Sequence, residues 1–367
     1  MLLTFACSQA PRPAAGPTPG TTAPALPEAC ARHSAPPPAP AGPRSSAPLW
    51  QLAAGLNGPD DLLFHDGSLL VGEINSGRID QLTPGLPIKQ LPQSVPKVEG
   101  MVYAGSRLLA ADQQDDRLQW VDDGSLFLQL KPVPGKDGVD GIAGDGRSVI
   151  VPDSPNGNVL WVDPGSKQVT KTVGGFSRPT GAWPEADGSL LVADEDGNAA
   201  YRVRPDGSRE TLISGLPVVD DVAADSSDRI FAVTPVISGG RLAEISDHQA
   251  HDLVSGLVAP QGLVFDRADN AIVSEEDAGR VDLAVRSFKL VPVAGAKDGE
   301  DVCIDVVRAP GFGGEVRLSA GGGLAVLSNP GGASQGSVRL KSCGEAPCLL
   351  TARSGGLSDQ LWIAAAS

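Results

Sequence analysis

The chain has 367 residues, more than a typical single domain, and carries a formal net charge of −15. This length predicts either two domains or one large repeat architecture. The negative charge repels phosphate backbones and anionic lipid headgroups, so we do not expect a nucleic-acid-binding protein. The 45 glycines and 32 prolines predict frequent turns and few sustained helices. We therefore expect an all-β protein.

The chain begins with a short apolar run that ends at Cys7, followed by a tract rich in proline and alanine as far as Pro48. This start resembles the end of a bacterial lipoprotein signal, in which residues 1–7 are the signal remnant and Cys7 carries the lipid. Residues 8–48 would then be a linker to the membrane. The alternative is that Cys7 is incidental. We expect an exported cell-envelope protein, lipid-anchored, periplasmic or extracellular, whose only membrane contact would be this anchor.

Six copies of one unit follow, at residues 57–85, 97–124, 138–165, 178–207, 217–247 and 259–285. Equivalent positions in successive copies lie 39, 41, 40, 40 and 41 residues apart. Each copy contains three strand-like runs separated by turns, and a fourth run precedes the next copy. Such a repeat predicts the four-stranded blade of a β-propeller. Residues 49–56 read as an isolated fourth strand, so we expect them to complete the sixth blade of a propeller spanning residues 49–288.

The repeats resemble NHL-type propeller units and the superfamily of gluconolactonase, senescence marker protein and luciferin-regenerating enzyme. The resemblance lies in motifs such as RPTGAW at 178–183 followed by DGSLLVADEDG at 187–197. Virginiamycin B lyase is similar at the same level. The resemblance implies a six-bladed propeller. For gluconolactonase-like enzymes it further implies a divalent metal at the propeller axis, whose bound water attacks a lactone or ester.

The period stops after Phe288, and residues 289–367 alternate apolar and polar residues between glycine-rich turns. This part resembles a small bacterial Ig-like β-sandwich, notably at RAPGFGGEVRLSA, residues 308–320. The resemblance implies a disulfide between Cys303 and Cys348 that joins two sheets. A bridge between Cys343 and Cys348 is the alternative, and a degenerate seventh blade is the alternative architecture.

Two sets of mostly acidic positions recur in the repeats, and we expect both on one face of the propeller. The inner ring opens the first strands and consists of Asp60, Glu99, Asp140, Thr180, Asp220 and Gln261. The strand-end ring closes the second strands and consists of Glu73, Asp112, Asp153, Asp194, Thr234 and Glu275. An acid at the end of the second strand commonly accepts hydrogen bonds from the turn after it, so we mainly expect the strand-end ring to anchor turns.

Four inner-ring residues are candidate ligands of a divalent cation such as Ca²⁺, namely Asp60, Glu99, Asp140 and Asp220. Carboxylates that converge on a narrow channel repel one another, which raises their pKa values unless a cation is present. The resembling lactonases hold their metal with an acid of the first blade, an Asn in an RPNG motif and an Asp in a PDG motif. Asp60 in GPDD and Asp220 in VVDD match this pattern. Thr180, in RPTG, stands where the Asn would be.

Two functions follow from these patterns. The first is a monomeric, non-catalytic envelope protein that binds a small molecule, a protein or a glycan through the acidic face formed by the two rings. The second is a metal-dependent hydrolase of lactones or esters. A lyase with a histidine base is disfavoured, because His33, His65, His248 and His251 fall in the linker, at a turn on the opposite face or at an outer edge. We favour the first function, since the ligand set of the second is incomplete.

Overall fold

The computed structural model describes residues 44–363 apart from 237–238, 299–300, 322 and 341–346. Cys7, Cys343, the predicted signal remnant at residues 1–7 and residues 8–43 of the predicted linker lie outside the described residues. Within the described part nearly all regular structure is strand, which confirms the all-β prediction. Among these residues no helix has the length and apolar character that a membrane crossing requires.

Six antiparallel sheets follow one another along residues 44–284. Sheet 1 holds β3 (Pro59–His65), β4 (Ser68–Glu73), β5 (Ile79–Leu82) and β6 (Lys89–Gln90). Sheet 2 holds β7 (Val98–Ala104), β8 (Arg107–Asp112), β9 (Arg117–Trp120) and β10 (Leu126–Gln129). Sheet 3 holds β11 (Ala143–Gly144), β12 (Val149–Asp153), β13 (Asn158–Val162) and β14 (Val169–Gly174).

The next three sheets repeat this arrangement and add the first two strands of the chain. Sheet 4 holds β15 (Pro179–Pro184), β16 (Leu190–Asp194), β17 (Ala199–Val203) and β18 (Arg209–Ser214). Sheet 5 holds β19 (Asp221–Ala224), β20 (Ile230–Thr234), β21 (Gly240–Ser246) and β22 (Gln249–Leu257), with β1 (Arg44–Ser45) at its edge. Sheet 6 holds β23 (Pro260–Phe265), β24 (Ala271–Glu275), β25 (Arg280–Ala284) and β2 (Leu49–Ala54).

The second strand of each sheet is a nearly unbroken apolar run because both of its faces are covered. Side chains alternate between the two faces of a strand. Leu190 and Val192 of β16 therefore lie in a core shared with sheet 3, whereas Leu191 and Ala193 lie in a core shared with sheet 5. Six such cores separate neighbouring sheets around a ring. Each sheet is thus stabilised by both of its neighbours.

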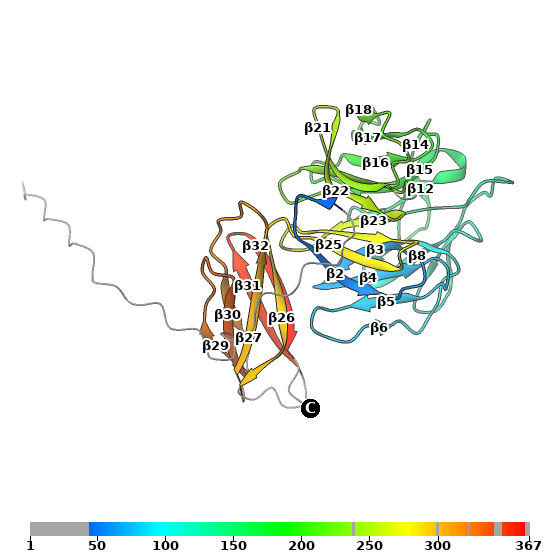
Figure 1. Cartoon of the computed structure of the whole chain (residues 1–367). Coiled ribbons are helices and arrows are strands. Elements are labelled where there is room, and N and C mark those ends of the chain that lie inside the picture. Colours follow the sequence, from blue (N-terminus) through cyan, green and yellow to red (C-terminus); the bar gives the residue numbers. More distant parts are fainter. Residues whose placement is uncertain (1–43, 237–238, 299–300, 322, 341–346, 364–367) are drawn as a thin grey trace, which may run out of the picture.

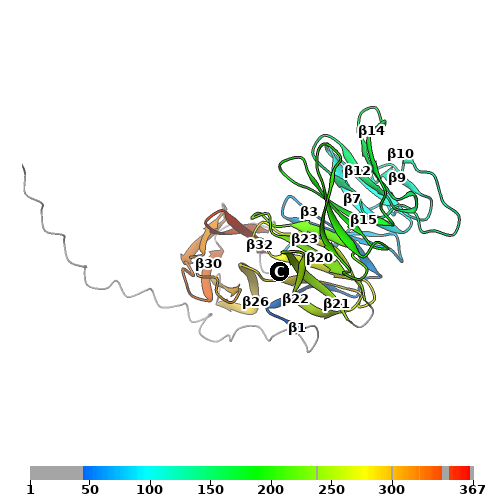
Figure 2. The ribbon, with the colours of Figure 1, turned by 90° about the horizontal axis from the view of Figure 1, so that it is seen from above.

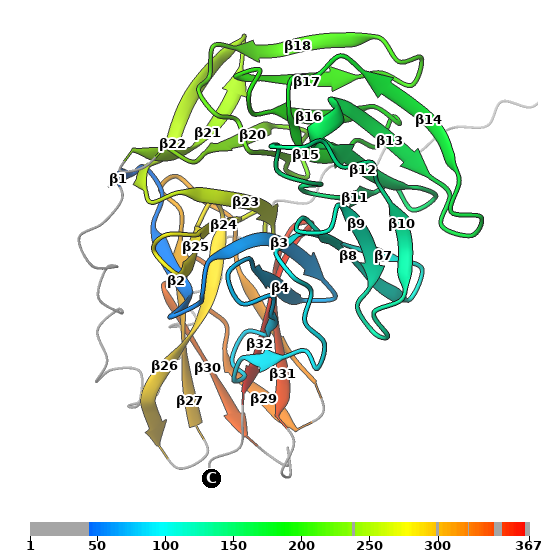
Figure 3. The same cartoon turned by 90° about the vertical axis from the view of Figure 1, so that its right-hand side faces the viewer.

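The ring is closed by the strand that the sequence predicted. β2 pairs antiparallel with β25, and its Ala53 lies in the core between sheets 6 and 1. The inner strands β3, β7, β11, β15, β19 and β23 contact one another in this order. β23 also contacts β3, and Figure 3 shows these two strands side by side. The expected linker also ends in structure, because Arg44 and Ser45 pair with Ser255 and Val254 of β22.

The inner strands approach one another most closely at a position that four of the six sheets fill with glycine. These residues are Gly100, Gly141, Gly181 and Gly262, each directly after an inner-ring residue. A Cβ atom added at Gly141 would lie 2.8 Å from the carbonyl oxygen of Thr180, and one at Gly262 would lie 2.6 Å from that of Asp60. The absence of a side chain therefore lets neighbouring strands meet backbone to backbone.

The chain after Phe288 forms two further sheets beside the ring (Figures 1 and 2). One sheet holds β26 (Phe288–Asp298), β27 (Asp301–Arg308), β30 (Gln335–Leu340) and β29 (Leu324–Ser328). The other holds β28 (Arg317–Ala320), β31 (Cys348–Ser354) and β32 (Leu357–Ile363). Both contribute to one apolar core, and the contacts among the inner strands that close the ring do not involve them. Its Ig-like character stays a prediction.

Backbone hydrogen bonds fasten this C-terminal part to sheets 1 and 6. The amide of Trp362 donates to the carbonyl of Pro84 at 2.9 Å, and the amide of Ser358 donates to that of Arg267 at 3.0 Å. Gly85, at φ +86°, packs against the carbonyl of Trp362 and leaves no room there for a side chain. These contacts between the C-terminal part and the propeller are therefore made by main-chain atoms.

We expect the substitution Gly141→Ala to destabilise the ring by about 1–3 kcal/mol, because the added methyl group forces β11 and β15 apart. Chemical denaturation of the purified protein measures this difference. Gly165→Ala is the matched control, since a Cβ there meets nothing closer than 3.5 Å. Equal stability of the two variants would contradict the close-approach argument.

Candidate functional site in the central channel

A cavity of about 270 Å³ runs between the inner strands of the propeller. Its walls include apolar side chains such as Leu62, Met101, Ile142 and Trp183. They also include six carboxylates, which are Asp60, Asp61, Glu99, Asp140, Asp220 and Asp221. Among the described residues that line it, none is a lysine, an arginine or a histidine. The channel is therefore a negatively charged space with partly apolar walls.

The structure brings together the four carboxylates that the sequence singled out. Asp60, Glu99 and Asp140 are each less than 8% exposed. Glu99 shares hydrogen bonds with both Asp60 and Asp140. Two neighbouring carboxyl groups can share a hydrogen bond only when one of them holds a proton. The cluster therefore needs a bound proton or another positive charge to be stable.

Burial is the main cause of the unusual acidity of this cluster. Removal from water raises the pKa of Asp60 well above its ordinary value, and the charges of Asp220 and Asp140 raise it further. Burial likewise raises the pKa values of Glu99 and Asp220 well above their usual range. The predicted repulsion within the inner ring is therefore present in the structure.

Arg178 supplies the positive charge nearest to these groups, and sequence reasoning missed it. Its Nη2 atom lies 2.7 Å from Oδ2 of Asp140, and its Nη1 atom pairs with Glu195. This guanidinium opposes the effect of burial on the pKa of Asp140. Arg178 belongs to the same RPTG motif as Thr180, but the pattern alone does not say which way its side chain turns.

The two uncharged members of the inner ring are already engaged. The hydroxyl of Thr180 donates to the backbone carbonyl of Asp220 at 2.6 Å. The Nε2 atom of Gln261 donates to Oε2 of Glu276 at 2.8 Å. Thr180 therefore serves as a link between sheets 4 and 5 rather than as an oxygen ligand directed at the cluster.

Asp61 and Asp221 occupy the two positions at which the other sheets have glycine, and they form a second layer of charge. The Asp61 carboxylate accepts the amide of Met101 in sheet 2, and Oδ2 of Asp221 accepts the amide of Leu263 in sheet 6. Each thus joins one inner strand to the next. Burial raises the pKa of Asp221 to about 7. Oδ2 of Asp61 is buried and has no hydrogen-bond partner within the described part of the chain.

The strand-end ring is buried and holds loops in place. Glu73 accepts two hydrogen bonds from Arg78, both at 2.8 Å, and Glu275 accepts one from Arg280 at 2.7 Å. Asp194 accepts the amides of Ser177 and Arg178, so it positions the loop that carries Arg178. Equivalent local bonds join Asp112 to Arg117 and Asp153 to Asn156, and Thr234 is buried. These contacts agree with the expected anchoring role, whereas a ligand contact for this ring stays a prediction.

The residues present do not form the metal site that the resemblance implies. The hydroxyl of Thr180 donates to the backbone carbonyl of Asp220, and the guanidinium of Arg178 lies beside the Asp140 carboxylate. Among the residues that the structure describes, no three His, Cys, Asp or Glu side chains are arranged to hold a metal ion. We therefore derive no chemical step through a metal.

The other candidate residues lie away from the channel. The ring of His65 stacks on Tyr103 at 4.0 Å, and Nδ1 of His248 lies 3.1 Å from the carbonyl oxygen of Leu212. Cys303 and Cys348 are both disulfide-bonded, and both are buried. The pairing of the cysteines stays a prediction.

Comparison with known proteins identifies the fold. No family model and no curated protein matches the sequence. A gluconolactonase from Xanthomonas campestris has a similar structure, with 15% identity and a TM-score of 0.55 over 69% of this chain and 98% of that one. A luciferin-regenerating enzyme is 11% identical with a TM-score of 0.52, over 66% and 95% of the two chains. A streptogramin B lyase is 12% identical with a TM-score of 0.51, over 64% and 96%. Likeness at these identities shows a shared propeller fold and assigns no activity.

Proposed function

We propose that the protein is an exported envelope protein whose propeller binds a small, positively charged ligand in its central channel and acts by binding rather than by catalysis. The observation that carries this proposal is the imbalance of charge. Six carboxylates line the channel, and among the described residues only Arg178 opposes them by a direct ion pair, which it forms with Asp140. A cationic ligand would relieve their mutual repulsion.

Two further features support a ligand in this place. The unpartnered Oδ2 atom of Asp61 is a buried acceptor, and a buried acceptor without a donor is unfavourable. The apolar walls formed by Leu62, Met101 and Trp183 suit the carbon skeleton of an organic cation. An organic ammonium can donate hydrogen bonds in several directions and does not need the regular ligand geometry of a metal ion.

The similar fold of the Xanthomonas campestris gluconolactonase keeps lactone hydrolysis as the alternative function. It would require a metal ion to displace Arg178 and to recruit Asp60, Glu99 and Asp220.

We expect the melting temperature to fall as the pH rises from 5 to 8. The channel acids have raised pKa values, so the folded state holds their protons more tightly than the unfolded state does. Stability is then lost as the pH rises above the unfolded value of about 4 and through the folded values, which for Asp221 is about 7. Groups with lowered pKa values, such as Glu73, act only below this window. Asp60→Asn should raise the melting temperature at pH 8 and flatten the curve.

The control for this experiment is Glu315→Gln, which alters a carboxylate whose side chain is 68% exposed in the C-terminal part. Its pH curve should match that of the wild type. A wild-type melting temperature that does not change with pH would show that the pKa values of the channel acids are not raised. An Asp60→Asn curve as steep as that of the wild type would show the same for Asp60.

We expect 1,4-diaminobutane, used as a simple organic dication, to bind the full chain at pH 8 and low salt. Calorimetry should give an affinity that falls at least tenfold in Asp220→Asn and stays unchanged in Glu315→Gln. Hydrolysis of glucono-δ-lactone is measured in parallel with Ca²⁺ and Mn²⁺. Absence of diamine binding contradicts the proposal, and metal-dependent turnover that Asp220→Asn abolishes would establish the hydrolase instead.

A further inference from the structure

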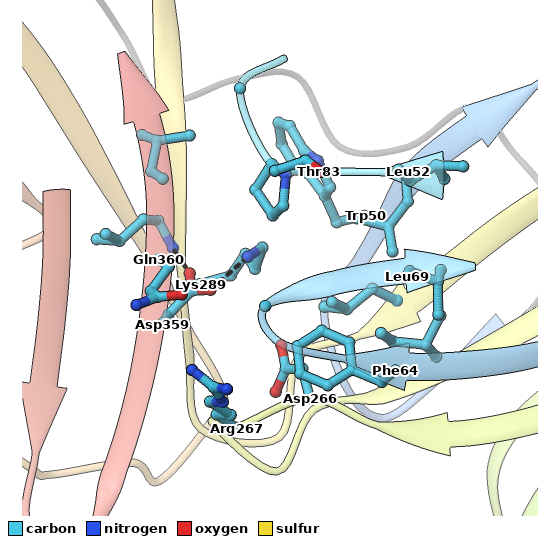
Figure 4. A pocket seen from close by; sticks show the side chains of 18 of the residues that line it. Trp50, Leu52, Phe64, Leu69, Thr83, Asp266, Arg267, Lys289, Asp359 and Gln360 are labelled. Atoms are coloured by element: carbon cyan, nitrogen blue, oxygen red, sulfur yellow. Dashed lines mark hydrogen bonds and ion pairs between the residues drawn. The ribbon is translucent and has the colours of Figure 1, made fainter. Parts of the chain in front are cut away.

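A second cavity, of about 220 Å³, lies where the C-terminal part meets sheets 1 and 6. Figure 4 shows Trp50, Leu52, Phe64 and Leu69 of the propeller on one side of it. Lys289, Asp359 and Gln360 of the C-terminal part lie on the other side (Figure 4). The cavity exists only because the two parts of the chain are docked together, and it is separate from the central channel.

The propeller wall of this cavity is apolar and incompletely covered. Trp50, Leu52 and Phe64 are only partly buried, although they pack against the core between sheets 6 and 1. Leu69, Ile272 and Leu283 lie behind them as buried members of that core. An apolar cavity of roughly 150 Å³ is large enough to bind benzene. The space is therefore sufficient for a small aromatic molecule.

The charges around the cavity are paired with one another. Nζ of Lys289 lies 2.6 Å from Oδ1 of Asp359, and the other oxygen of Asp359 accepts the amide of Leu290 at 2.7 Å. Arg267, at the rim, lies 3.7 Å from Asp66. The pairing leaves neither of these cations without a carboxylate partner.

Asp266 is the remaining charged group of the wall, and it is satisfied within its own turn. Its Oδ1 atom accepts the amides of Ala268 and Asn270 at 2.8 and 2.9 Å, and its Oδ2 atom accepts Nδ2 of Asn270 at 3.0 Å. A charged ligand would lose its hydration on entering such a space, which is costly, and the Asp266 carboxylate already accepts three hydrogen bonds. A neutral ligand has no such cost.

We propose that this cavity is a binding site for a neutral, largely apolar small molecule of the size of a substituted benzene. Because the walls come from both parts of the chain, such a ligand joins the propeller to the C-terminal part. The proposal concerns a site separate from the channel and does not depend on the function proposed for it.

The test compares three probes that share a phenylethyl group on the full chain: 2-phenylethanol, which is neutral, phenethylamine, which is cationic, and 3-phenylpropionate, which is anionic. Saturation-transfer NMR and thermal shift give their affinities. We expect 2-phenylethanol to bind at least tenfold more tightly than either charged probe. A charged probe that binds as tightly as the neutral one overturns the assignment of ligand class, and the absence of saturable binding overturns the site.

Variants locate the binding. Leu86→Trp fills the cavity from its rim and should weaken 2-phenylethanol at least tenfold, whereas Leu126→Trp, at a residue 50% exposed on β10, should leave it unchanged. Thr83→Phe fills the same cavity from another position and provides the test if Leu86→Trp does not fold. Unchanged binding in a folded cavity-filling variant would overturn the location.

Discussion

The architecture depends on one constraint: each propeller sheet is apolar on both faces and cannot be stable in water alone. A sheet of this kind needs a neighbour on each side, and only a closed ring gives every sheet two neighbours. This explains why the second strands carry runs such as SLLVAD rather than the alternation of a half-exposed strand. It also explains why β2, at the start of the described chain, completes the last sheet of the ring. An open ring would leave the cores on either side of the gap exposed to water.

Ring closure has an electrostatic consequence at the centre. Six first strands must converge, and the residue at the start of each is then brought close to five others. Where those residues are acids, burial and mutual repulsion act together, as the raised pKa values of Asp60, Glu99 and Asp220 show. Arg178 offsets part of this charge, and Asp194 holds the loop that carries it. A residue that anchors a loop in one sheet thereby also determines where a positive charge lies beside the channel carboxylates.

Much of this could be predicted from the sequence, because a period near 40 residues reports both the sheets and their equivalent positions. The closing strand and the convergence of Asp60, Glu99, Asp140 and Asp220 followed from that period alone. The roles of Arg178 and Thr180 could not be predicted, because they depend on the rotamers of these side chains. Arg178 turns toward the Asp140 carboxylate, and Thr180 turns toward the backbone carbonyl of Asp220. The sequence does mark Asp61 and Asp221, because they replace the glycine that the other four sheets have at the same position. The cavity between the two parts lay beyond prediction because it arises from their docking.

The position of β2 has a consequence for the order in which the protein is made. Leu49–Ala54 is synthesised before any other strand of sheet 6, yet its partner β25 ends at Ala284. The core between sheets 6 and 1 therefore stays incomplete until more than two hundred further residues have been added. Pairings between such distant segments are slow to form, because the loop between them must close before the contact stabilises anything. A chain built in this way has no closed ring until β25 has been made.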